Sequence, residues 1–89
     1  MIIKVLGPGC ARCHQLENMT REVIRELAID ATVEYVKDIR EIMKYPIMAT
    51  PGLVINEEVV SSGKVPDKAK ITQLITTALE KEGKETGKL

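Results

Sequence analysis

The chain has 89 residues, carries no net formal charge and is 44% hydrophobic. This length predicts a single domain, and the hydrophobic share is enough for a packed core, which excludes a disordered chain. Aromatic residues make up only 2% of the chain. Balanced charge and few aromatic side chains argue against proteins that bind nucleic acid or an anionic membrane through basic or stacking surfaces.

The sequence also predicts a protein that does not interact with membranes. It has no apolar run near the roughly 20 residues that a transmembrane helix needs. Residues 1–6 lack the charged start, the long apolar stretch and the cleavage site of a signal peptide. We therefore expect a cytoplasmic protein. In that compartment a pair of cysteines is usually catalytic or metal-binding rather than a structural cross-link.

The first half of the chain predicts a strand, a helix and a second strand. Residues 2–6 are mainly β-branched and apolar, and the Gly-Pro-Gly that follows them is typical of a tight turn. Residues 11–28 place apolar side chains at helical spacing. Residues 32–36 have the composition and alternation of a strand. Because a helix links the two strands, we expect them to be parallel, with a right-handed crossover and the first strand inside the sheet.

The middle of the chain predicts a short helix and a hairpin. Asp38 is a plausible N-cap, and the helix that it begins should end near Tyr45, because Pro46 disfavours helical geometry in the residue before it. The sequence predicts two further strands, at residues 53–55 and 58–61. Only two residues separate them, so they should form an antiparallel hairpin.

The last predicted element is a helix with one apolar face, which Asp67 can cap. Glycines and alternating charges in residues 83–89 predict a flexible tail, so the domain should cover residues 1–82. The resulting order is strand, helix, strand, helix, strand, strand, helix. It predicts an α/β fold in which a four-stranded mixed sheet has helices on both faces.

The two cysteines of the chain, Cys10 and Cys13, lie where the first strand ends and the first helix begins. On a helix, residues three apart are neighbours, and their Cα separation suits an ordinary disulfide of about 5.5 Å. Cys10 falls at the helix start, where unpaired N–H groups and the helix dipole favour a thiolate. We predict a redox-active dithiol, with Cys10 as the attacking nucleophile and Cys13 as the resolving thiol. Arg12 and His14 are candidate cationic modulators of the thiolate.

Other functions share this motif. Cys-x-x-Cys-His is the attachment pattern of c-type haem, but the β-rich pattern and the lack of an export signal argue against it. The main alternative is a soft-metal carrier that binds copper or zinc through the same two thiolates. A structural or protein-interaction role is a third possibility. A closed zinc site is not expected, because Cys10, Cys13 and His14 are the only soft ligands. The redox function predicts no bound metal and no cofactor.

A second stretch, Ala-Thr-Pro-Gly at 49–52, precedes the strand predicted at 53–55. Together with Cys-x-x-Cys followed by a helix, it resembles the thioredoxin and glutaredoxin superfamily over about residues 1–82. The chain is more narrowly similar to the small thioredoxin-like redox proteins of archaea and bacteria. The resemblance implies a thioredoxin-like fold and a cis peptide bond before Pro51. It also implies that the backbone of Thr50 pairs with an extended substrate chain.

The resemblance further implies a thiol–disulfide oxidoreductase that reduces the disulfides of protein substrates. A separate reductase would supply its electrons, and we expect the protein to act as a monomer. The sequence departs from the thioredoxin branch in two places. That branch has Trp-Cys-Gly-Pro-Cys where residues 9–13 read Gly-Cys-Ala-Arg-Cys. It also keeps a buried Asp at the position that an ungapped count assigns to Lys4.

Overall fold

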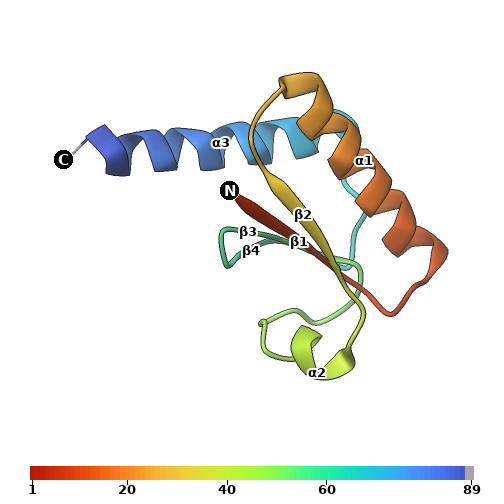
Figure 1. Ribbon diagram of the computed structural model, residues 1–89. Helices are drawn as coiled ribbons and strands as arrows, with labels where there is room; N and C mark the ends of the chain where they lie inside the picture. Colours follow the sequence, from red (N-terminus) through yellow and green to blue (C-terminus); the bar gives the residue numbers. More distant parts are fainter. Residues whose placement is uncertain (88–89) are drawn as a thin grey trace.

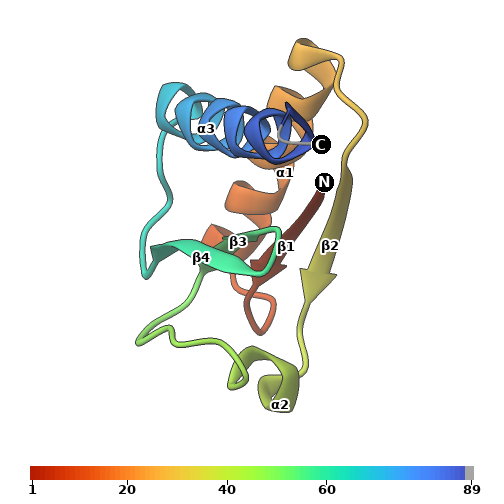
Figure 2. The ribbon, with the colours of Figure 1, turned by 90° about the vertical axis from the view of Figure 1, so that its left-hand side faces the viewer.

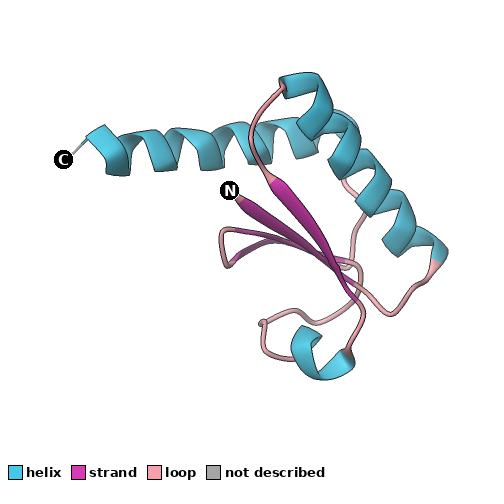
Figure 3. Cartoon of the chain, in the orientation of Figure 1, coloured by secondary structure: helices cyan, strands magenta, loops and turns pink. Residues whose placement is uncertain are grey.

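A computed structural model of the chain contains a four-stranded sheet with helices on both faces (Figure 1). The structure describes residues 1–87, with side chains as far as Glu82. Figure 3 shows the helices, the strands and the loops that join them. In chain order the elements are β1 (Ile2–Leu6), α1 (Ala11–Leu27), β2 (Thr32–Val36), α2 (Ile39–Ile42), β3 (Gly52–Ile55), β4 (Glu58–Ser62) and α3 (Lys68–Gly87).

The sheet has the strand order β2-β1-β3-β4. β1 is parallel to β2 and antiparallel to β3, and β3 is antiparallel to β4. β1 is therefore an interior strand, as its apolar composition predicts, and Ile3, Val5 and Leu6 are fully buried. The parallel pair joined by α1 and the antiparallel hairpin both match the sequence prediction. The predicted α/β fold with a mixed four-stranded sheet is confirmed.

Two apolar clusters fill the spaces on the two faces of the sheet. Figure 2 shows α1 and α3 together on one face and α2 on the other. Because side chains alternate along a strand, Ile3 and Val5 of β1 face α1 and α3, whereas Leu6 faces α2. The buried members of the larger cluster are Ile3, Val5, Leu16, Val23, Leu53, Ile55, Ile71 and Ile75. Those of the smaller cluster are Leu6, Ile42 and Val54.

The first two helices are shorter than the sequence predicts. α1 ends at Leu27 rather than at residue 28, because Ala28 takes the left-handed conformation with φ 54°. α2 is capped by Asp38, whose carboxylate accepts a hydrogen bond from the backbone N–H of Arg40 at 2.9 Å. It ends at Ile42 and not near Tyr45, since the chain tightens into turns before Pro46.

The hairpin of β3 and β4 turns through Asn56 and Glu57, and both residues have positive φ, 50° and 68°. Such a two-residue turn matches the twist of the strands that it joins. Asn56 also contacts the start of β1: its N–H donates to the Ile2 carbonyl at 2.8 Å, and its side-chain oxygen accepts from the Ile2 N–H at 3.0 Å. Each strand is one residue longer than predicted, beginning at Gly52 and ending at Ser62.

The last helix begins as the sequence predicts and continues beyond the predicted domain boundary. The Asp67 carboxylate accepts from the backbone N–H of Lys70 at 2.8 Å, as an N-cap does. The helix then continues to Gly87, past the boundary placed at residue 82. Of the predicted tail, residues 88–89 lie outside the described residues. None of the described helices is long and apolar enough to cross a membrane.

Candidate active site

The two cysteines lie together at the N-terminus of α1 but in different surroundings. Cys10 is the N-cap residue, with extended backbone geometry, and its sulfur accepts a hydrogen bond from the backbone N–H of Cys13 at 3.3 Å. Both are free thiols. Cys10 is exposed, whereas Cys13, in the first turn of α1, is 0% exposed. The arrangement offers one sulfur to solvent and keeps the other inside.

The pKa values of the two thiols shift in opposite directions. The pKa of Cys10 is lowered, first by a hydrogen bond from the Cys13 thiol and then by the Cys13 backbone N–H. The pKa of Cys13 is raised, first by burial and then by its hydrogen bond with Cys10. The first proton to leave the pair therefore comes from Cys10. An exposed thiolate beside a buried thiol is the combination that thiol–disulfide exchange uses.

Gly7 makes the close approach of Cys13 to the sheet possible. It follows β1 directly, and its N–H donates to the Val36 carbonyl at 2.9 Å. A Cβ at this position would lie 2.3 Å from the Cys13 sulfur and 2.8 Å from the Cys13 Cβ. Any other residue would therefore collide with the buried thiol. In the sequence Gly7 is recognisable only as part of a turn, because nothing local indicates which side chain meets it.

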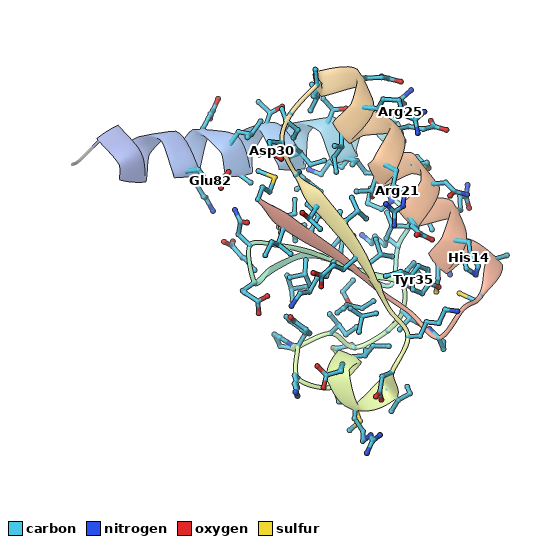
Figure 4. The ribbon with its side chains drawn as sticks, in the orientation of Figure 1. His14, Arg21, Arg25, Asp30, Tyr35 and Glu82 are labelled. Carbon is cyan, nitrogen blue, oxygen red and sulfur yellow. The ribbon has the colours of Figure 1, made fainter. Side chains whose placement is uncertain are left out.

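Tyr35 of β2 is a second residue of the site that no sequence motif indicates. Its ring lies against the His14 ring, with centroids 5.1 Å apart, and Figure 4 shows the two side chains together near the N-terminus of α1. The Tyr35 hydroxyl is buried and has no hydrogen-bond partner among the described residues. Burial, followed by the nearby Cys13, raises the pKa of Tyr35 to about 12. The hydroxyl therefore stays protonated at neutral pH.

Arg12 and His14 lie next to the cysteines, and each has a polar partner of its own. The Arg12 guanidinium donates a hydrogen bond to the Gly63 carbonyl at 3.1 Å. The His14 Nδ1 lies 3.6 Å from a carboxylate oxygen of Glu17. Their proposed action on the Cys10 thiolate through positive charge stays a prediction.

The segment before β3 is linked by hydrogen bonds through Gly63 to the end of α1 that carries the cysteines. The Thr50–Pro51 peptide bond is cis, which is the geometry that the resemblance implies. The Pro51 carbonyl accepts a hydrogen bond from the Gly63 N–H at 2.9 Å, and Gly63 in turn accepts from Arg12. Gly63 thus joins Pro51 to the start of α1. Within residues 1–87, Thr50 takes part in no hydrogen bond.

Lys4 lies on the sheet face opposite the cysteines, because it alternates with Ile3 and Val5 along β1. Its ammonium group donates to a Glu57 carboxylate oxygen and to the Tyr45 hydroxyl, both at 2.8 Å. These two hydrogen bonds, that of Glu57 first, raise the pKa of Lys4. Lys4 therefore belongs to a surface network and not to the chemistry of Cys13.

Among the described residues, no group of three or more His, Cys, Asp or Glu side chains could hold a metal ion. A metal carrier would have to rely on the two sulfurs of Cys10 and Cys13.

Comparison with known proteins identifies the family. A family model described as a thioredoxin domain matches residues 1–76. A thioredoxin of Methanothermobacter thermautotrophicus is 37% identical over 76 residues, which cover 85% of this chain and 99% of that protein. A thioredoxin of Methanocaldococcus jannaschii is 31% identical over 80 residues, covering 90% and 92%. A probable thioredoxin of Archaeoglobus fulgidus is 35% identical over 84 residues, covering 91% and 89%.

These matches agree with the fold and with the paired cysteines at the helix start, and they give the metal-carrier alternative no support. The chain belongs to the thioredoxin family and is a thiol–disulfide oxidoreductase.

Proposed function

We propose that Cys10 and Cys13 are the redox-active dithiol of this oxidoreductase and that its substrates are protein disulfides. The observation that carries the proposal is the difference between the two thiols. Cys10 is exposed with a lowered pKa, and Cys13 is fully buried with a raised pKa. An attacking thiol needs access and thiolate character, whereas a resolving thiol needs only to reach its neighbour.

The reaction proceeds through a mixed disulfide. The Cys10 thiolate attacks one sulfur of the substrate disulfide, and the other substrate sulfur leaves as a thiolate that takes up a proton. Cys13 then loses its proton and attacks the Cys10 sulfur. The mixed disulfide breaks, the second substrate sulfur leaves, and a Cys10–Cys13 disulfide forms. Two electrons have passed to the substrate, and no bound cofactor takes part.

The substrate chain is proposed to lie along the segment that leads into β3. The unpaired backbone of Thr50, next to the cis Pro51, can bond to an extended chain as an added strand. Met48, just before this segment, is 99% exposed. Flexible methionine side chains suit surfaces that accept varied partners. The substrate class is therefore an exposed, extended segment that carries a disulfide.

A separate reductase is proposed to return the oxidised form to the dithiol. The proposed reducing activity fits a compartment that keeps thiols reduced, which is the cytoplasm. The donor can be identified by incubating the oxidised protein with a pyridine-nucleotide-linked reductase, a ferredoxin-linked reductase or glutathione. The measurement is the rate at which the Cys10–Cys13 disulfide disappears. Rapid reduction by glutathione alone would argue against a dedicated reductase.

The roles of the two cysteines are tested by trapping the intermediate. We expect Cys13→Ser to accumulate a mixed disulfide between Cys10 and a disulfide-containing peptide, because the resolving thiol is gone. The matched variant, Cys10→Ser, should accumulate none, since Cys13 is buried. Mass spectrometry without reductant measures the adduct. Trapping by Cys10→Ser but not by Cys13→Ser would reverse the assignment, and trapping by neither would contradict the dithiol mechanism.

A further inference from the structure

The Tyr35 hydroxyl is a buried polar group without a partner. Within the part of the chain whose side chains are described, it is the one buried side-chain nitrogen or oxygen that makes no hydrogen bond. Leaving a buried hydroxyl unpaired costs stability, so native proteins rarely keep such a group. A group of this kind at a redox site calls for an explanation in the chemistry of that site.

The hydroxyl lies beside the buried thiol. Tyr35 pairs with Val5 in the parallel register of β1 and β2, which places its side chain on the face covered by α1. The position of a Cβ on Gly7 gives a common reference point: the Cys13 sulfur is 2.3 Å from it and the Tyr35 oxygen 3.7 Å. The Cys13 sulfur, from α1, and the Tyr35 hydroxyl, from β2, therefore both lie close to Gly7, which has no side chain. Here a hydroxyl can turn its proton toward the sulfur.

Cys13 needs a hydrogen-bond donor at one stage of the reaction. The proposed resolving step ionises its sulfur, and a charge buried without a partner is strongly disfavoured. We propose that Tyr35 is a catalytic residue of the resolving step, whose hydroxyl donates a hydrogen bond to the Cys13 sulfur as that sulfur becomes a thiolate. This inference depends on the roles proposed above for Cys10 and Cys13. It also accounts for the missing partner, because a neutral thiol is a weak acceptor and a thiolate a strong one.

The step balances without any further reactant. In the mixed disulfide, the Cys13 sulfur forms a bond to the Cys10 sulfur, and the bond from Cys10 to the substrate sulfur breaks. The Cys13 proton passes to the leaving sulfur or, when that sulfur stays ionised, to water. Tyr35 keeps its own proton throughout, since burial and Cys13 raise its pKa to about 12. In the reverse direction, when a reductase opens the disulfide, the same hydroxyl stabilises Cys13 as it leaves.

Other ionisable groups face this site and belong in any pH measurement. Cys10 and Glu17 lie close enough to act on Tyr35, each raising its pKa after the larger effects of burial and Cys13. His14 lies against the ring of Tyr35 from α1. The Lys37 ammonium lies 6.0 Å from the centre of the same ring, just beyond β2. Tyr35 stands out because its polar atom is buried and unpartnered.

The test is Tyr35→Phe, which removes the hydroxyl and keeps the ring. The matched control is Tyr45→Phe, which removes a hydroxyl bonded to Lys4 and Glu57 on the other face of the sheet. Each reduced protein is mixed with an aromatic disulfide whose thiol product is coloured, and release is followed by stopped flow. Release of the first equivalent of coloured thiol, the first phase, reports attack by Cys10. Release of the second equivalent, the second phase, reports resolution by Cys13.

We expect Tyr35→Phe to slow the second phase by roughly tenfold or more, the effect of losing a hydrogen bond to a charged group. The first phase and both phases of Tyr45→Phe should stay within about twofold of the wild type. The pH at which the second phase reaches half its maximum should rise in Tyr35→Phe, because the Cys13 thiolate becomes harder to form. A purely structural role would not move this midpoint.

The outcomes separate this inference from the proposed function. If the wild type shows no second phase, the dithiol roles fail, and the inference fails with them. If the wild type shows both phases and Tyr35→Phe leaves the second phase and its pH midpoint unchanged, only the inference is overturned. Equal slowing of both phases together with a lowered melting temperature would also overturn it, since that pattern indicates a general packing defect.

Discussion

Gly7 shows how one missing side chain can determine the geometry of a redox site. The Cys13 sulfur lies only 2.3 Å from the position that the Cβ of any other residue would take. The thiol can therefore sit against the end of β1, inside the fold and yet at the start of α1. Burial raises the pKa of Cys13, so its place against Gly7 contributes to the chemical difference between the two thiols.

We predict that Gly7→Ala destabilises the reduced protein by about 2 kcal/mol, a typical cost of overpacking a buried site. It should also push Cys13 outward and make that thiol open to alkylation in the folded protein. The measurements are chemical denaturation and native-state alkylation followed by mass spectrometry.

The matched control for this prediction is Gly9→Ala. Gly9 has φ 108°, so an alanine there is strained, but no atom beyond its two chain neighbours lies within 4 Å of the added Cβ. It should lose stability through the backbone and leave Cys13 protected. If Gly7→Ala keeps Cys13 as protected as Gly9→Ala does, the packing argument for Gly7 is wrong.

At the scale of elements, the hairpin of β3 and β4 determines where the substrate segment lies. Its turn is fixed at one end by Asn56, which bonds twice to Ile2 at the start of β1. At the other end of the pair, Gly52 lies opposite both Leu6 and Ser62. The hairpin therefore carries Pro51 to the end of β1 at which the cysteines lie.

We predict that Asn56→Ala costs more stability than Asn56→Gly. Both substitutions remove the side-chain hydrogen bond to Ile2, but only alanine is strained at φ 50°. The difference should be about 1 kcal/mol, the penalty that a left-handed conformation imposes on a residue with a Cβ. Urea denaturation of the two variants measures it. Equal losses would mean that the hydrogen bond, and not the backbone conformation, is what selects asparagine.

At the scale of the whole molecule, the cysteine pair links stability to pH. Cys10 has a lowered pKa in the folded protein, so its ionisation favours the folded state. Its contribution is complete above the ordinary cysteine value of about 8.5 and is lost as the pH falls through the folded pKa. Cys13 acts in the opposite sense: its raised pKa disfavours the folded state as the pH rises above about 8.5.

We predict that Cys10→Ser, compared with the reduced wild type, loses more stability at about pH 8 than at about pH 5. As the pH falls through the folded pKa of Cys10, the sulfur becomes neutral like the serine oxygen, so the substitution removes less. Denaturation in urea with a reductant present, at several pH values, gives the difference. The same series with Cys13→Ser should not show this rise below about pH 8. A constant difference for Cys10→Ser would contradict a lowered Cys10 pKa in the folded state.

Much of this fold follows from local sequence patterns. Helical spacing, strand composition and the caps at Asp38 and Asp67 predict the element order, and the structure confirms both caps. These signals act within a few residues, so they can be recognised in the sequence without knowledge of the tertiary contacts. The boundaries were less accurate, since they depend on turns such as the one at Ala28 and on neighbouring strands. The position of Cys10 at the start of a helix was predictable for the same local reason.

The sequence by itself determined the order of elements, the fold class and the pair of cysteines. Only the tertiary structure decided what surrounds the second cysteine. Three residues meet there: Gly7 directly after β1, Cys13 in α1 and Tyr35 in β2. They meet because the two strands are parallel and the helix crosses over them. The register of the strands and the way the helix crosses them are set by packing over the whole core. Sequence patterns indicate only which side of an element is buried. The exposure of a thiol and its proton affinity depend on such distant neighbours.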